Sequence, residues 1–264
     1  MSGAIPALLR GLVDDAAVFP PGNAALEDAV AAHRVHRASW YSEMVGPLLV
    51  PASRLPDLDP GRGELEIGVV VDCELQHVAG AVAQLDPRVA VVGYESRAAV
   101  QDLVAAAKDW DAPVCAELPF EEDALDSLVG TGLIPKFRTG GPAAESFPSP
   151  RDLAAVLVGC ARRAMRCKLT AGLHRAVRHT DAGTGFVHHG FLNVMAASAE
   201  AAAGAGVEPV ARLLASTDAG KLVERTRSLL DRPRPLWNGF GSCSIAEPLE
   251  DLTELSLLTR GGNS

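Results

Sequence analysis

The sequence predicts an α/β protein whose residues 1–264 form one domain, a (β/α)8 barrel of the TIM type. The length of 264 residues is close to that of a single such barrel and is enough to bury one large core. Short β-branched runs alternate with segments of helical periodicity, which is typical of a parallel sheet covered by helices on both faces or closed into a barrel. Four of these runs end in a charged residue, at Asp72, Glu95, Glu117 and Lys136.

Eight strands are expected along the chain, and the first is the weakest because Asp14 and Asp15 interrupt it. A doubly wound open sheet is the competing architecture, but the first turn shows no GxGxxG pattern of a nucleotide-binding version. The barrel is therefore preferred. The expected strands are 13–19, 46–50, 66–72, 89–95, 113–117, 133–136, 166–169 and 236–241.

Helical patterns fill the gaps between these runs. Ser149 and Pro150 supply an N-cap and a proline at the first helical position, before the run that leads to Lys168. Ser96 is the expected N-cap of the helix between the fourth and fifth strands, whose apolar residues repeat with helical spacing. Further helices are expected over 24–40, 191–205, 209–230 and 249–258.

The connection between the seventh and eighth strands is much longer than the others. It begins with residues 171–190, which contain four of the seven histidines of the chain. A long polar loop on the catalytic face of a barrel typically forms a lid or a binding element. We therefore predict an active-site loop over 171–190 and leave open whether its histidines contact a metal ion or the substrate.

The composition limits the class of partner. A formal net charge of −9 argues against nucleic acid and anionic membranes as partners, although a local field in a cleft can still attract an anionic substrate. The five cysteines lack CxxC spacing and are expected to be reduced thiols of a cytoplasmic protein. No signal peptide or membrane-spanning run is expected. A small-molecule substrate is the predicted partner, and homo-oligomerisation is left open.

Strand ends of a barrel point into the mouth where the loops build the active site. Lys136 and Lys168 stand 32 residues apart (168 minus 136), which is the length of one strand–helix–strand unit, so they are expected side by side on neighbouring strands. Asp14 or Asp15 is an early acidic addition. The predicted catalytic residues are Lys136, Lys168, Asp72, Glu95 and Glu117.

Glycine-bearing loops follow the seventh and eighth strands, where barrels often bind phosphate through backbone N–H groups. An arginine near such loops adds a fork of donors for a phosphate or a carboxylate. The predicted substrate-binding residues are Arg138, Thr139, Gly140, Gly172, His174, Asn238, Gly239, Gly241 and Ser242.

The segment from Lys136-x-x-Thr139-Gly140 to Lys168-x-x-x-Gly172 resembles the class I aldolase barrels of the deoxyribose-phosphate aldolase type. The resemblance implies a carbon–carbon lyase without a cofactor that acts on a small anionic carbonyl compound, phosphorylated or not. It also implies that Lys136 forms a Schiff base, and that the nearby cation of Lys168 helps the amine to lose its proton. Asp72 or Glu95 is the candidate for the general acid/base aspartate of that family. Arg138 departs from the family, which has a small hydroxyl residue there.

Two alternatives stay open. In the first, the three strand-end carboxylates bind Mg²⁺ and Lys136 is a general base beside a metal-bound enolate, in a lyase or isomerase similar to the enolase superfamily. In the second, the barrel binds a small anion without catalysis. A variant of the metal hypothesis places Zn²⁺ or Fe²⁺ on one of the carboxylates and on histidines of 171–190, namely His174, His188 and His189.

Overall fold

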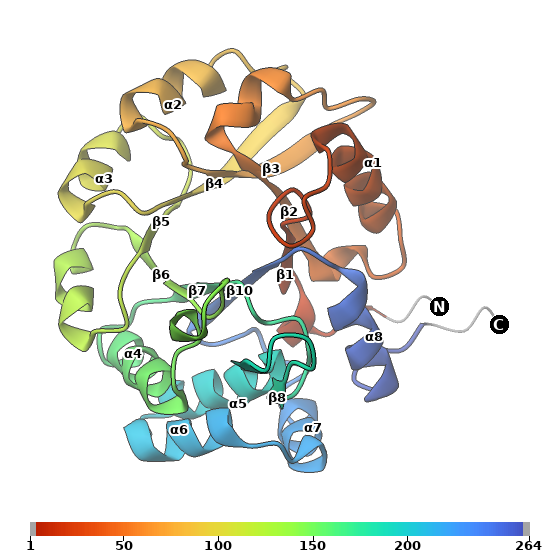
Figure 1. Cartoon of the computed structure of the whole chain (residues 1–264), viewed down its shortest axis with the longest axis vertical. Coiled ribbons are helices and arrows are strands. Elements are labelled where there is room, and N and C mark those ends of the chain that lie inside the picture. Colours follow the sequence, from red (N-terminus) through yellow and green to blue (C-terminus); the bar gives the residue numbers. More distant parts are fainter. Residues whose placement is uncertain (1–3, 261–264) are drawn as a thin grey trace.

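The structure is a computed structural model that describes residues 4–260, and it contains a closed barrel of parallel strands (Figure 1). The strands follow one another around the barrel in the order β1-β10-β7-β6-β5-β4-β3-β2, which confirms the predicted fold class. They are β1 (Val13–Asp15), β2 (Val45–Pro51), β3 (Leu65–Val70), β4 (Val89–Ser96), β5 (Val114–Glu117), β6 (Ile134–Arg138), β7 (Cys167–Thr170) and β10 (Trp237–Ser242).

Helices surround the barrel, but they are distributed less evenly than one per strand. The connections from β2 to β3 and from β5 to β6 contain 3-10 helices, η3 (Ala52–Asp57) and η4 (Glu122–Leu128), and no α-helix. Shorter 3-10 turns are η1 (Ala7–Leu9), η2 (Ser42–Met44) and η5 (Ala144–Ser146). The α-helices are α1 (Leu26–Arg37), α2 (Leu75–Val82), α3 (Val100–Ala106), α4 (Pro150–Arg162), α5 (Phe191–Ala202), α6 (Val207–Ala215), α7 (Ala219–Arg227) and α8 (Ala246–Glu254).

The long connection between β7 and β10 differs from the prediction in two ways. The helix expected over 209–230 is two helices, α6 and α7, and the second begins where the side chain of Asp218 accepts a hydrogen bond from the backbone N–H of Lys221. The loop 171–190 contains a short antiparallel hairpin, β8 (His179–Thr180) with β9 (Val187–His188), which the sequence pattern did not reveal. Two-residue strands are too short to show a periodicity of their own.

The two expected N-caps had different outcomes. Ser149 caps α4 in a capping box with Asp152, and Pro150 is its first residue, as predicted. Ser96 does not cap α3, because that helix begins after Ala99. The hydroxyl of Ser96 instead accepts a hydrogen bond from the N–H of Ala98 in the turn that leaves β4.

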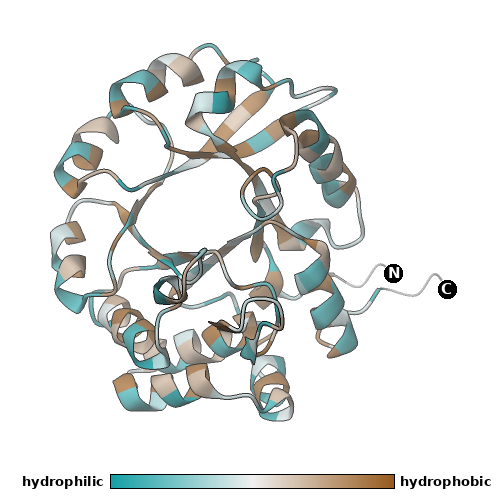
Figure 2. Cartoon of the chain, in the orientation of Figure 1, coloured by the Kyte–Doolittle hydropathy of each residue, from teal (hydrophilic) through white to brown (hydrophobic). Residues whose placement is uncertain are grey.

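Side chains alternate between the inside and the outside of the barrel along each strand. Phe137, Leu169 and Phe240 point outward into the larger apolar core, which lies between the barrel and helices α4 to α8. A second apolar core fills the space beneath helices α1 to α3. Figure 2 shows the result, with apolar residues along the strands and on the inner sides of the helices, and polar residues outside.

The first strand is shorter than expected and ends at its two aspartates. Its register with β10 pairs Asp14 with Gly241 and Asp15 with Ser242. Neighbouring residues of a strand face opposite sides, so the side chain of Asp14 points into the barrel and that of Asp15 points out of it. Asp15 is buried outside the barrel against His33 of α1, with 3.0 Å between its Oδ2 and the imidazole Nδ1.

Arg234 joins the two chain segments that close the barrel at its amino-terminal end. Its buried guanidinium donates hydrogen bonds at 2.6 to 3.3 Å to backbone carbonyl oxygens before β1 and in β10. The five acceptors belong to Leu8, Arg10, Gly11, Trp237 and Asn238. A planar fork of donors suits this arrangement better than an ammonium group does.

We predict that Arg234→Met lowers the free energy of unfolding by at least about 3 kcal/mol, because it leaves several buried carbonyls without donors. Urea unfolding followed by circular dichroism measures this change. Arg227→Met is the matched control, since Arg227 is an exposed residue of α7, and it should change the free energy by less than about 0.5 kcal/mol. Equal effects of the two substitutions would show that the buried guanidinium does not stabilise barrel closure.

Candidate active site

The barrel register places the two lysines directly beside each other. Lys136 of β6 pairs with Lys168 of β7 on one side and with Glu117 of β5 on the other. Paired residues of adjacent parallel strands point to the same face of the sheet. The side chains of all three therefore enter the interior at the carboxyl ends of the strands, where barrels carry their active sites.

Glu95, from β4, connects the two lysines. Its Oε2 lies 2.7 Å from the Nζ of Lys136, and its Oε1 contacts the Nζ of Lys168. Lys136 also contacts Glu117, with 3.1 Å between Nζ and Oε2. Since both ammonium groups contact one carboxylate, their nitrogens lie within roughly 8 Å of each other, the span of two ion-pair contacts and a carboxylate.

Lys168 has a second carboxylate partner, Asp14 of β1. Burial by itself lowers the pKa of Lys168, but Asp14 and Glu95 outweigh it and raise that pKa well above its ordinary value. Burial likewise raises the pKa of Glu95, yet Lys168 and Lys136 outweigh it and bring the value to about 2. Burial raises the pKa of Asp14, and Lys168 offsets this only in part. Lys168 therefore stays an ammonium ion at neutral pH.

Two arginines extend the cluster to the rim. The Nε atoms of Arg97 and Arg138 lie 3.0 and 3.2 Å from Oε1 of Glu117. Burial raises the pKa of Glu117, but Lys136 and Arg138 outweigh it, so the pKa lies below its ordinary value. The lysine cluster, as we call this set, consists of four basic side chains, Lys136, Lys168, Arg97 and Arg138, and three acidic ones, Asp14, Glu95 and Glu117.

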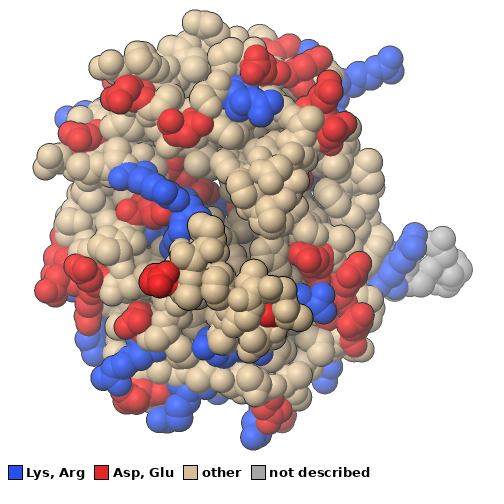
Figure 3. Space-filling model, in the orientation of Figure 1, with Lys and Arg blue, Asp and Glu red and all other residues tan. Residues whose placement is uncertain are grey.

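The charge of this cluster opposes that of the protein. Four cations and three carboxylates leave one positive charge in excess when all are ionised, whereas the chain as a whole carries −9. Figure 3 shows basic and acidic side chains meeting at one side of the central hollow on this face. A site of this kind attracts anions despite the acidic surface around it.

Several predicted substrate-binding residues have structural contacts of their own. The hydroxyl of Thr139 donates a hydrogen bond of 2.6 Å to the carbonyl of Ala171, which ties the loop after β6 to the loop after β7. Gly140 and Gly172 let these loops approach, because a Cβ on Gly140 would stand 2.7 Å from the Cα of Gly172. Gly172 also has a φ of +75°, which favours glycine.

The remaining predicted residues lie after β3 and in β10. Asp72 lies outside the cluster and accepts hydrogen bonds of 2.9 and 2.6 Å from the backbone and hydroxyl of Ser53. Gly241 is level with Asp14, near the lysines. Ser242 forms a turn with Ser244, to whose carbonyl its hydroxyl donates. Asn238 and Gly239 lie opposite Lys168, because β10 pairs with β7 through Trp237 with Cys167 and Phe240 with Leu169, but the side chain of Asn238 accepts a hydrogen bond from Arg166.

His174 belongs to a second polar group at the mouth, formed by the loops after β7 and β10. Its Nδ1 lies 3.0 Å from Oε2 of Glu247 and 4.0 Å from Sγ of Cys243. Cys243 and Glu247 raise the pKa of His174, although burial acts in the opposite direction. This group is separate from the hydrogen bonds and ion pairs of the lysine cluster.

The arrangement of acids and histidines does not form a metal centre within residues 4–260, where no group of three or more His, Cys, Asp or Glu side chains has suitable geometry. Glu95 and Glu117 face the lysines instead of a common point with Asp72. His189 is buried against the carbonyl of Pro148 at 2.8 Å, and burial lowers its pKa to about 4.

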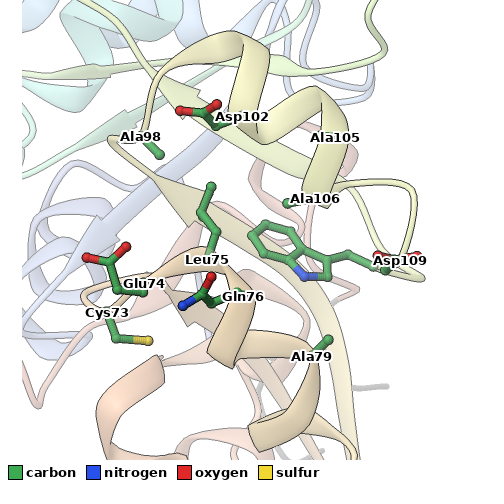
Figure 4. A pocket seen from close by; sticks show the side chains of 11 residues that line it. Cys73, Glu74, Leu75, Gln76, Ala79, Ala98, Asp102, Ala105, Ala106 and Asp109 are labelled. Atoms are coloured by element: carbon green, nitrogen blue, oxygen red, sulfur yellow. The ribbon is translucent and has the colours of Figure 1, made fainter.

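A groove of about 640 Å³ lies away from this cluster, between α2 and α3 (Figure 4). No member of the lysine cluster lines it. Its thiol, Cys73, is a poor nucleophile, because burial and the neighbouring Asp72 and Glu74 raise its pKa. The lining of the groove contains carboxylates and this thiol but no lysine, arginine or histidine, so we take the lysine cluster as the candidate functional site.

Comparison of the chain with family models, curated proteins and solved structures found no match. None of the helices within residues 4–260 is long and apolar enough to cross a membrane.

Sequence reasoning did not single out Arg97 or the buried Cys115, whose pKa burial raises to about 12. Side chains two residues apart along a strand face the same side. This period predicts Arg97 on the same side as Glu95, and Cys115 on the same side as Glu117. Nothing in the sequence distinguishes Asp14 from Asp15, since only the register of β1 does so.

We predict that Glu95→Gln destabilises the protein at pH 7 by about 3 to 5 kcal/mol, because two buried ammonium groups lose their shared carboxylate. The pKa of Glu95 falls from 4.5 to about 2 on folding, so its contribution is complete above pH 4.5 and disappears as the pH falls toward 2. Unfolding free energies measured across this range should therefore converge for wild type and variant.

The matched control is Glu66→Gln, at an exposed carboxylate on β3, which should keep the pH dependence of the wild type. A constant difference between wild type and Glu95→Gln from pH 7 to pH 2 would contradict the linkage.

Proposed function

We propose that the chain is an enzyme of the carbon–carbon lyase class that forms a Schiff base between Lys136 and a small carbonyl compound. The observation that carries this proposal is the environment of Lys136. Its amine is buried at the mouth end of the barrel, lies within hydrogen-bond distance of two carboxylates and has a second lysine beside it. Nucleophilic amine catalysis requires an amine, proton acceptors and a desolvated pocket in this arrangement.

Each lysine contacts two carboxylates, but the carboxylates differ in how many cations they serve. Both partners of Lys136 are shared, Glu95 with Lys168 and Glu117 with two arginines. Lys168 instead has Asp14 as a partner that forms its ion pair with Lys168, and Asp14 and Glu95 hold it as a cation, so we assign it the role of a poor nucleophile. Its fixed charge opposes a second positive charge on Lys136 in the same pocket. Lys136 is accordingly the nucleophile and Lys168 the activating cation.

The proposed reaction begins when Lys136 transfers a proton to Glu95 or Glu117 and attacks the carbonyl carbon of the substrate. The carboxylic acid then returns this proton to the hydroxyl of the carbinolamine, which leaves as water, so that a protonated imine remains and the carboxylate is restored. The bond between the α and β carbons then breaks, and the imine accepts its electron pair. At the same time a carboxylate takes the hydroxyl proton of the departing aldehyde. Protonation of the resulting enamine and hydrolysis of the imine release the second product and restore Lys136.

Glu95 is the residue best placed for these proton transfers, because it contacts Lys136 and is anchored by Lys168. Asp72, the other candidate for this role, lies with Ser53 instead. The resemblance to the deoxyribose-phosphate aldolase type thus leads to the proposal that Glu95 takes the part of the general acid/base aspartate of that family.

We expect sodium cyanoborohydride with small aldehydes or ketones to fix the reduced substrate on Lys136. Peptide mass spectrometry should then show the added mass on the peptide that carries Lys136. The variant Lys136→Met should show no adduct at that position, and Lys168→Met should be labelled at least about tenfold more slowly, because the activating charge is gone.

The control is Lys221→Met, at an exposed residue of α7, which should be labelled on Lys136 like the wild type. Labelling of Lys168 in preference to Lys136, or no adduct with a panel of small carbonyl compounds, would refute the proposed role of Lys136.

A further inference from the structure

We propose that Arg97 and Arg138 form a clamp for a carboxylate or phosphate group of the substrate, and that Glu117 is the positioning residue which orients them. The proposal rests on the proposed function, because it assigns the polar end of the same substrate. Arg138 is the last residue of β6, and Arg97 directly follows β4. Glu117 ends β5 between them.

The way in which Glu117 contacts the arginines leaves their outer edges open. Each arginine approaches Oε1 through its Nε atom. Among the residues that the structure describes, no acceptor takes a hydrogen bond from the Nη groups of Arg97 or Arg138. Two guanidinium groups held on one oxygen thus retain their Nη donors, and such donors bind carboxylate and phosphate in a bidentate manner.

Charge compensation alone does not account for both arginines. Glu117 already contacts Lys136 at 3.1 Å and Arg138 at 3.2 Å, so its single negative charge faces two cations before Arg97 is counted. An exposed arginine added to such a carboxylate contributes little to stability. An incoming anion would balance the third cation.

The exposed fractions of these side chains indicate how a bound substrate would be oriented. The side chain of Arg97 is 67% exposed and that of Arg138 is 37% exposed, whereas that of Lys136 is 4% exposed. The anionic group would therefore remain at the rim while the carbonyl group reaches inward. One carboxylate, that of Glu117, spans the gap from Lys136 to the arginines, so only a few bonds separate the two ends of the substrate.

The test compares matched pairs of carbonyl compounds on Arg97→Gln/Arg138→Gln. The pairs are pyruvate with its neutral methyl ester, and glycolaldehyde phosphate with glycolaldehyde, each trapped on Lys136 with cyanoborohydride. We expect the ratio of anionic to neutral trapping rates to fall about 10- to 100-fold. Loss in the first pair identifies a carboxylate as the bound group, and loss in the second pair identifies a phosphate. An unchanged ratio in both pairs would overturn the clamp.

Arg225→Gln is the matched control, since Arg225 is a surface residue of α7 that pairs with Glu200, and it should keep the wild-type ratio. Glu117→Gln should lower the ratio less than the double variant, because both guanidiniums remain but lose their common anchor. An equal fall in the Arg225→Gln variant would show that overall charge, and not the clamp, sets the ratio.

Binding of pyruvate and inorganic phosphate, measured by isothermal titration calorimetry without reductant, separates this proposal from the proposed function. Binding that the double variant loses, in a wild type that forms no adduct, would support the clamp and refute the Schiff base. An adduct on Lys136 together with an unchanged ratio and unchanged binding would support the Schiff base and refute the clamp.

Discussion

The candidate site depends on the ion pairs that the carboxylate of Glu95 forms with two lysines. The carboxylate shares its two oxygens between Lys136 and Lys168, which the barrel buries on neighbouring strands. Buried charges are costly unless they are paired, so these two lysines can enter the interior only where acidic residues meet them. Three strands must therefore keep their register for the ammonium groups to be compensated.

The network continues from this carboxylate in two directions that differ in their surroundings. Toward β1 it ends at Asp14, a buried partner that keeps Lys168 charged. Toward β5 it passes through Glu117 to Arg138 and the solvent-exposed Arg97. The buried end of the network holds a cation and the end at the rim keeps free guanidinium donors, which is what the proposed reaction inside the barrel and the proposed clamp at the rim require.

Much of this layout follows from rules that act locally. Apolar runs with helical segments between them predicted the closed barrel, and the charged residue after each of four runs predicted an inward-facing site. Glu95, Glu117, Lys136 and Lys168 meet as those rules require, because strand ends of a barrel converge. The same rule also predicted Asp72 in the site, but Asp72 lies in the turn after β3 and accepts hydrogen bonds from Ser53 instead.

The sequence by itself determined the class of fold and the two lysines at the centre of the site, because strand length, alternation and spacing are properties of short segments. Only the tertiary structure decided that Asp14 enters the barrel while Asp15 meets His33. It also decided that Arg97 joins Arg138, and that Thr139 ties two loops together. These outcomes depend on the register between strands and on contacts between distant loops, and a shift by one residue would turn every side chain to the opposite face.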